Sequence, residues 1–148
     1  MVEVAHICFL ILYAEAMNEY YDQPTAQVYE YVDIVREKAG LKGVKESWLK
    51  ARNISKPNTK EGMREIIRRE RMIELAFEGK RFWDLRRWKL AYTYYNSVAM
   101  GWNADGAGAD FYIPRALYSY TYSIKNYLWP IKETTLRADV NLVQNPYW

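Results

Sequence analysis

The sequence predicts an all-α fold in a single domain, 1–148, with three parts: a helical hairpin over 3–40, helical segments over 59–96, and a loop and irregular, aromatic-rich tail over 97–148. Two apolar patterns with helical spacing, separated by a turn, predict the hairpin. A charged segment with apolar residues every three or four positions predicts the second part. Three prolines and alternating tyrosines make the tail irregular or briefly extended. At 148 residues the chain is long enough to bury a substantial core.

The first helix of the hairpin is expected over residues 3–21, where apolar side chains nearly encircle it. A helix that is apolar all round needs cover on several sides. His6 is expected to be a hydrogen-bonded core residue. Cys8, the only cysteine, is expected to be an inert apolar side chain, and a lone cysteine allows no disulfide within the chain.

The second helix of the hairpin is expected over 25–40, after a turn at 22–24, with Gly40 ending it. Val28, Val32 and Val35 share one face of this helix. The hairpin has roughly the 34 residues of a tetratricopeptide-like repeat. Such repeats are stable only when stacked on neighbours, so the remaining cover is expected from outside the hairpin.

A loop over 41–57 is expected to lead into a long helix capped by Asn58, which has a glutamate three positions further on. This helix is expected to reach Glu78, to break at Gly79 and to be followed by a second helical stretch over 81–96. A turn-rich loop, 101–109, then precedes the tail, which we expect to wrap the helices.

Two glutamates of the long helix fall on its apolar face. On a helical wheel Glu70 and Glu74 lie near the middle of the stripe formed by Met63, Ile66, Ile67, Ile73 and Phe77. Burying a carboxylate without compensation costs several kcal/mol, so each of the two glutamates needs a cationic partner, a metal ion or a proton. The favoured interpretation is a lattice of carboxylates and arginine side chains, because guanidinium groups satisfy carboxylates in bidentate fashion. The candidate arginines are Arg36, Arg71, Arg81, Arg86 and Arg87.

Three other functions for this segment remain open. A di-metal site would use inward glutamates, but it would also need Glu-x-x-His motifs that this sequence lacks. Acid–base catalysis would use a pair of carboxyl groups. Its candidates are Glu70, Glu74, Glu78 and Asp84. A nucleic-acid surface would combine arginines with stacking tryptophans, although the interleaved acids would oppose phosphate. Its candidates are Arg68, Arg69, Arg86, Arg87, Trp83 and Trp88. The favoured role of the two tryptophans is packing, because their helical stretch also carries Phe82 and Leu85.

The overall charge of +3 is only a weak indication of nucleic-acid binding. The apolar run over 7–14 is too short to span a bilayer and lacks the basic flank of a secretory signal. If the protein is exported, its targeting signal is expected to lie outside this chain.

The segment "IIRRERMIELAFEGKRFWDLRRW" resembles the signature of the SusD/RagB family, approximately ERxxELxFEGxRxxDLxRW. Three flanking segments resemble that family in the right order. "LILYAEAMNE" and "VREKAGL" are similar to its LxYAEAxNE and VRxRAGL segments, and the closing "NLVQNPYW" is similar to its usual end. Lys132 stands where the family usually has proline, and Trp148 replaces its common Gly-Tyr ending.

The resemblance implies an α-helical, tetratricopeptide-like protein of the outer-membrane cell surface that binds oligosaccharides, or peptides in some branches, and is not an enzyme. It implies a SusC-like TonB-dependent transporter and the N-terminal remainder of a longer protein as partners, a lipid anchor that this chain lacks, and no cofactor. Only the C-terminal portion of the family pattern is present. No known ligand-binding residue can be carried over, because the family's site lies largely before this region.

The best local candidates for ligand binding are Trp102, Asn103 and Asp105, because sugar rings stack on aromatic planes beside polar groups. A loop tryptophan folded back on the helices is the competing interpretation. Several tyrosines could line a groove or cover a core. They are Tyr94, Tyr95, Tyr118, Tyr120 and Tyr122.

A structural ion-pair network is assigned to Glu70, Arg71, Glu74, Glu78, Arg81, Asp84 and Arg87. The alternative function is a protein-interaction module that pairs with the transporter or with the N-terminal remainder and contacts no ligand itself.

Overall fold

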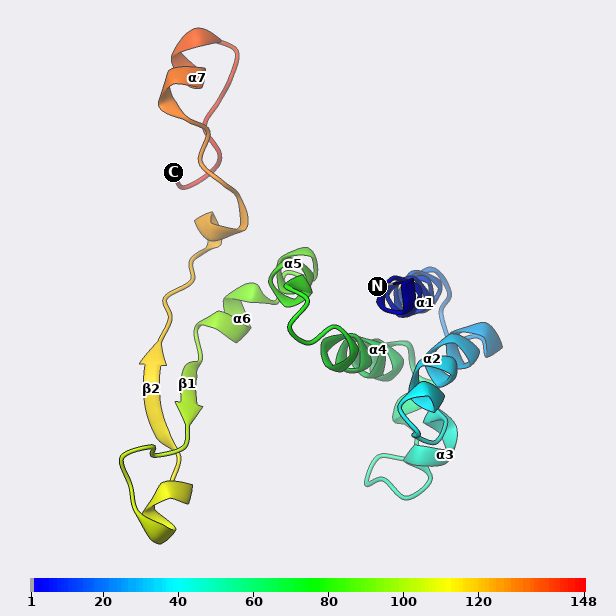
Figure 1. The fold of residues 1–148 in the computed structure, drawn as a ribbon. Coiled ribbons are helices and arrows are strands. Elements are labelled where there is room, and N and C mark those ends of the chain that lie inside the picture. Colours follow the sequence, from blue (N-terminus) through cyan, green and yellow to red (C-terminus); the bar gives the residue numbers. More distant parts are fainter. Residues whose placement is uncertain (1) are drawn as a thin grey trace. The chain divides into compact units, whose positions relative to one another are not determined.

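The computed structural model describes residues 2–148, with side chains described from His6 onward. It is mostly helical and contains two compact units, Met1–Arg81 and Phe82–Trp148. Figure 1 shows the order of the elements. The helices and strands are α1 (Val2–Tyr20), α2 (Ala26–Lys38), α3 (Val44–Trp48), α4 (Lys60–Glu74), α5 (Lys80–Arg87), α6 (Ala91–Tyr95), β1 (Val98–Gly101), β2 (Arg115–Ser119) and α7 (Glu133–Ala138), and the 3-10 turns are η1 (Lys56–Asn58), η2 (Gly108–Tyr112) and η3 (Ile124–Tyr127).

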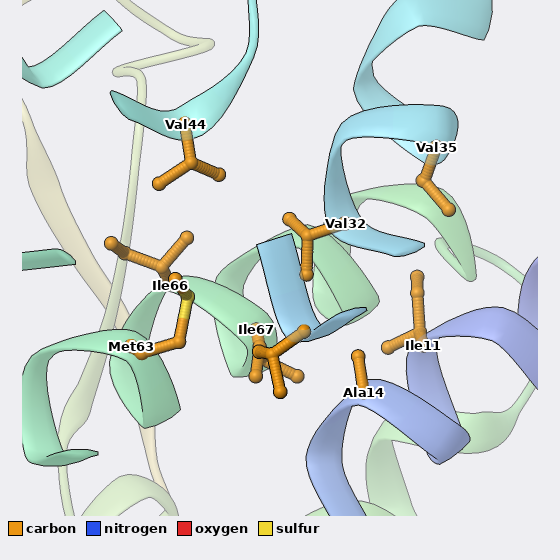
Figure 2. Packing of buried hydrophobic residues seen from close by; sticks show 9 residues of the cluster. Ile11, Ala14, Val32, Val35, Val44, Met63, Ile66 and Ile67 are labelled. Atoms are coloured by element: carbon orange, nitrogen blue, oxygen red, sulfur yellow. The ribbon is translucent and has the colours of Figure 1, made fainter. Parts of the chain in front are cut away.

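The first unit is built on the expected helical hairpin. Helices α1 and α2 are joined by the short connection 21–25, and α4 packs against α1. Figure 2 shows the aliphatic side chains of α1, α2, α3 and α4 pointing toward one another in one core. Those labelled are Ile11, Ala14, Val32, Val35, Val44, Met63, Ile66 and Ile67. The apolar stripes predicted for α2 and for most of α4 therefore meet in this core, but Ile73 and Phe77, which were expected on the stripe of the long helix, are exposed.

The buried stripe of α1 runs through Ile11, Ala14 and Asn18. His6 lies off this stripe and is exposed, so its predicted burial in the core is wrong. On the remaining surface of α1, Phe9 is 75% exposed and Tyr13 is 52% exposed. The all-round apolar character of the helix is therefore only partly covered in the first unit.

Asn18 and Glu19, the "NE" pair at the end of α1, fasten this helix to the start of α4. Asn18 Nδ2 donates to the carbonyl oxygen of Lys60 at 3.1 Å, and the Lys60 ammonium donates to the carbonyl oxygen of Glu19 at 2.7 Å. Arg64 Nη2 donates to the Glu19 carboxylate at 2.7 Å. These contacts hold the carboxyl end of the hairpin's first helix against α4.

Helix α4 begins and ends at positions that differ from the sequence prediction. Thr59, and not Asn58, is the cap: its Oγ1 accepts a hydrogen bond from Gly62 N at 3.1 Å. The helix ends at Glu74, before the predicted Glu78. Phe77 and Gly79 both have positive φ, 66° and 67°, so the backbone turns before the expected break.

The second unit contains a two-stranded antiparallel sheet that the sequence suggested only as a brief extension. Strand β1 pairs with β2, and Val98 faces Ser119 while Gly101 faces Arg115. A bulge lies between Ala99 and Met100. The predicted helix over 81–96 is divided into α5 and α6, and Lys89 between them has a φ of 56°.

Arg86 joins the tail to α5 within the second unit. Its guanidinium donates to the carbonyl oxygen of Asn126 at 2.5 Å and to that of Tyr127. Its charge lies over the rings of Phe82 and Trp129, 5.0 and 5.3 Å from their centroids. The tail is thus held to α5, whereas the arrangement of residues 1–148 as one wrapped domain stays a prediction.

In the part of the chain that the structure describes, none of the helices combines the length and the apolar character needed to cross a membrane.

Candidate functional site

Trp102 stands directly after β1, at the mouth of the loop that leads to β2, and its side chain is 57% exposed. Its ring stacks against Phe111, with centroids 6.4 Å apart and planes at 19°, and meets the edge of Tyr112 at 5.9 Å. The tryptophan is therefore supported by aromatic neighbours of its own loop and still presents much of its surface to solvent. Such a ring can stack on the apolar face of a sugar.

The loop around Trp102 is closed by hydrogen bonds of its neighbour Asn103. Asn103 N donates to the carbonyl oxygen of Phe111 at 3.1 Å, and the Asn103 carbonyl accepts from Gly106 N at 3.0 Å. Arg115 Nη1 donates to Asn103 Oδ1 at 2.9 Å. A Cβ on Gly106 would lie 2.9 Å from the backbone carbonyl carbon of Asp110, so the close approach of the two backbones favours glycine there.

Asp105 is exposed in the same loop, so the structure places all three predicted ligand-binding residues together. Asn103 contributes to loop closure, and an exposed guanidinium from Arg115 joins the site. The arrangement offers an aromatic plane, an amide and a carboxylate on the loop, with a guanidinium from the start of β2. This combination suits a ligand with apolar ring faces and hydroxyl groups, although the role of these residues in binding stays a prediction.

Phe111 and Arg115 also belong to this site, although the sequence patterns did not single them out. Phe111 precedes β2 and stacks on Trp102, and Arg115 begins β2 and donates to Asn103. Both contacts form because β1 and β2 pair across the loop. One feature of the sequence could have indicated these contacts: the Trp102 loop lies between two short segments that can pair as a hairpin.

The tyrosines form a second cluster in the same unit. Tyr95 lies 5.4 Å from Tyr122 and 6.3 Å from Tyr120, between ring centroids. The hydroxyl groups of Tyr118 and Tyr120 are 3.0 Å apart, and this hydrogen bond raises the pKa of Tyr120. The Asn96 side chain makes two hydrogen bonds to the backbone of Tyr122: Nδ2 donates to the carbonyl oxygen, and Oδ1 accepts from the amide nitrogen, each at 2.8 Å.

Glu70 lies in the interior of the first unit beside Arg36, and both residues are buried. Arg36 Nη1 donates to Glu70 Oε1, Nε donates to the carbonyl oxygen of Lys42 at 2.9 Å, and Nη2 donates to Ser47 Oγ at 2.9 Å. Arg71 is also buried, and its Nη1 lies 3.6 Å from the Cys8 sulfur. A carboxylate in the core is thus matched by a guanidinium with several acceptors.

The other residues of the predicted network are distributed differently. Burial, and then the charge of Glu70, raise the pKa of Glu74, while Lys38 lowers it. Asp84 is buried and accepts from Arg87 Nε at 2.9 Å, whereas Glu78 is exposed and Arg81 is half-buried. The assignment of all seven residues to one structural network therefore stays a prediction. Among the side chains that the structure describes, residues 6–148, no group of three or more His, Cys, Asp or Glu is placed to hold a metal ion.

A sequence profile described as the SusD family matches residues 9–148. The chain is 36% identical over 107 residues to "SusD-like protein P2" of Formosa agariphila, an alignment that covers 71% of this chain and 20% of that protein. The structure matches a SusD-like protein of Bacteroides fragilis with a TM-score of 0.77 at 27% identity, over 96% of this chain and 25% of that one. It also matches a SusD homologue of Bacteroides thetaiotaomicron with a TM-score of 0.58 at 28% identity, over 94% and 25% of the two chains.

The chain spans between a fifth and a quarter of the length of these relatives. The profile covers almost the whole chain, and the solved structures agree with it in fold. The chain therefore belongs to the SusD family.

Proposed function

We propose that the chain is the C-terminal portion of a nutrient-binding protein that captures a glycan at the outer-membrane surface and passes it to a SusC-like TonB-dependent transporter. SusD-family proteins are generally carbohydrate-binding proteins of nutrient uptake, and the family binds ligands without catalysing a reaction. Members typically are cell-surface lipoproteins and generally pair with SusC-like transporters. An oligosaccharide is the proposed ligand, and capture and handover need no cofactor.

The exposed Trp102 ring is the observation that supports a contribution of this chain to binding. Its support by Phe111 fixes the ring before a ligand arrives, which reduces the ordering cost of binding. The polar groups of Asn103, Asp105 and Arg115 stand beside it and can order the hydroxyl groups of a sugar. We propose Trp102, Asn103 and Asp105 as ligand-binding residues, with Arg115 added by the structure.

Isothermal titration with a panel of neutral oligosaccharides tests this proposal. Replacing Trp102 by Ala is expected to weaken binding by about tenfold or more, because truncating an aromatic side chain that anchors a binding surface costs about 2 kcal/mol or more. The matched control is Trp83→Ala, since Trp83 is 58% exposed and lies outside the loop. Equal weakening by both substitutions would contradict a specific role for Trp102.

A second candidate function is an interaction module that contacts no ligand itself. The exposed apolar side chains of α1, which include Phe9 at 75% and Leu12 at 39%, favour this role. The partner would be the transporter or the N-terminal remainder of a longer SusD-type protein. A folded sample that is silent across the oligosaccharide panel, yet binds a partner in a manner weakened by Phe9→Ser, would support this function over the first.

A further inference from the structure

The segment 41–60 concentrates positive charge on the surface of the first unit. It carries six Lys or Arg residues and one acidic residue, although the whole chain has a charge of only +3. It includes the short helix α3, the turn η1 and the loop between them. We call this segment the basic loop.

Four of its cations already have neighbours. Lys42 pairs with Glu46, and Lys56 pairs with Glu65 of α4. The Lys45 ammonium lies 4.1 Å from the centre of the Tyr29 ring. The fourth, Lys60, makes the contact with α1 described above.

Lys50 and Arg52, at the far end of the basic loop, are exposed and have no ion-pair partner among the residues that the structure describes. Aliphatic side chains stand on either side of them: Leu49 is 65% exposed and Ile54 is 58% exposed. The tip of the loop therefore presents two available cations between two solvent-exposed aliphatic side chains.

The base of the basic loop is fixed to the core. Val44 and Pro57 are fully buried, and Trp48 packs against the hydrophobic cluster. The Tyr29 hydroxyl donates to the carbonyl oxygen of Pro57 at 2.8 Å, and Arg36 donates to that of Lys42. Anchors on both sides of the tip keep it at the surface, so its apolar side chains are not free to fold into the core.

We propose that the tip of the basic loop, Leu49–Ile54, is a contact surface for a lipid membrane with anionic headgroups. Each Lys or Arg near such a surface is attracted to it, and neighbouring aliphatic side chains gain by entering the boundary between headgroups and acyl chains. A soluble polyanion would use the cations alone and leave Leu49 and Ile54 in water. The pairing of cations with exposed aliphatic residues therefore favours a lipid surface, and this inference does not depend on the glycan site.

Co-sedimentation of the full chain with vesicles tests the electrostatic part. Vesicles of equal parts phosphatidylcholine and phosphatidylglycerol are expected to bind the protein, in a manner weakened by salt, and vesicles of phosphatidylcholine alone are expected to bind it poorly. The double variant Lys50→Gln, Arg52→Gln is expected to weaken binding to the anionic vesicles by about 25-fold, because each cation near the membrane surface contributes about fivefold. The matched control, Lys80→Gln with Lys132→Gln, removes the same charge at exposed positions outside the loop and is expected to have a much smaller effect.

A second variant tests the apolar part without changing charge. Leu49→Ser with Ile54→Ser is expected to weaken vesicle binding and to leave binding to a soluble polyuronate unchanged. Equal losses in the loop and control pairs would overturn the proposal. Polyuronate binding as strong as vesicle binding, with no effect of the serine variant on either, would also overturn it and identify a polyanion site. Circular dichroism checks folding, and the two variants alter different side chains, so either one alone tests the surface.

Discussion

Arg36 serves three acceptors in the interior of the first unit: the Glu70 carboxylate, the Lys42 carbonyl and the Ser47 hydroxyl. Removing one member of a buried ion pair leaves an uncompensated charge and costs about 3–5 kcal/mol. Arg36→Met is therefore expected to lower the free energy of unfolding by that amount in urea titrations. Glu46→Gln is the surface control and is expected to cost less than about 1 kcal/mol, because the Lys42–Glu46 pair is largely exposed. A small loss in Arg36→Met would contradict a structural role for Glu70.

Glu19 connects stability to pH at the junction of α1 and α4. The hydrogen bond that Arg64 donates lowers the pKa of Glu19 below its ordinary value of 4.5, and the positive charge of Arg64 lowers it further. A carboxylate with a lowered folded-state pKa adds stability above 4.5, and this contribution is lost as the pH falls through the folded-state pKa. The wild-type protein is thus expected to be more stable than Glu19→Gln above pH 4.5, with the difference shrinking in more acidic buffer.

Chemical denaturation of both proteins across this pH range measures the difference. Arg64→Met provides the matched partner variant and is expected to reduce the same pH-dependent contribution, because it removes the donor. A wild-type advantage that stays constant across the range would show that the Glu19–Arg64 contact does not govern the titration.

Thr59 caps the amino-terminal end of α4, the helix that carries Glu70 and part of the aliphatic core. Its hydroxyl oxygen satisfies Gly62 N, one of the unpaired donors of the first turn. Thr59→Ala is expected to lower the free energy of unfolding by about 0.5–2 kcal/mol. The neighbouring Asn58→Ala is the control and is expected to be nearly neutral, because Asn58 is exposed in η1 and does not cap α4. The opposite order of effects would restore Asn58 as the cap.

The sequence predicted the elements whose signal is periodic. The apolar stripes of α2 and α4 placed Val32 and Ile67 in the core, and the wheel placed Glu70 there with them. It did not predict the sheet, because β1 has only four residues and becomes a strand by pairing with β2 beyond an intervening loop. Trp102 could be predicted as a site residue from its own loop sequence. Its stacking partner Phe111 could not, because the two rings meet only when β1 and β2 pair. Local signals at a helix end were also ambiguous, since two neighbouring polar residues could each have capped α4.

Burial is distributed unevenly between the two units. The first contains the aliphatic cluster of α1, α2, α3 and α4. Of the described residues in the second, only Asp84, Leu85 and Ala91 are buried, and its sheet has two strands. A two-stranded sheet with little buried apolar surface is marginally stable, so the second unit is expected to open at lower free energy than the first.

Amide hydrogen exchange followed by mass spectrometry tests this difference in the intact chain. After correction for intrinsic rates, peptides from α1 and α4 are expected to be protected much longer than peptides from β1 and β2, because opening the helices exposes the aliphatic core. The Ile67→Val variant is the internal control: it removes one buried methylene, which costs about 0.5–1.5 kcal/mol, and is expected to speed exchange in α4 while leaving β1 and β2 unchanged. Equal protection of β2 and α4, or a parallel response of both to Ile67→Val, would show that the chain opens as one cooperative body.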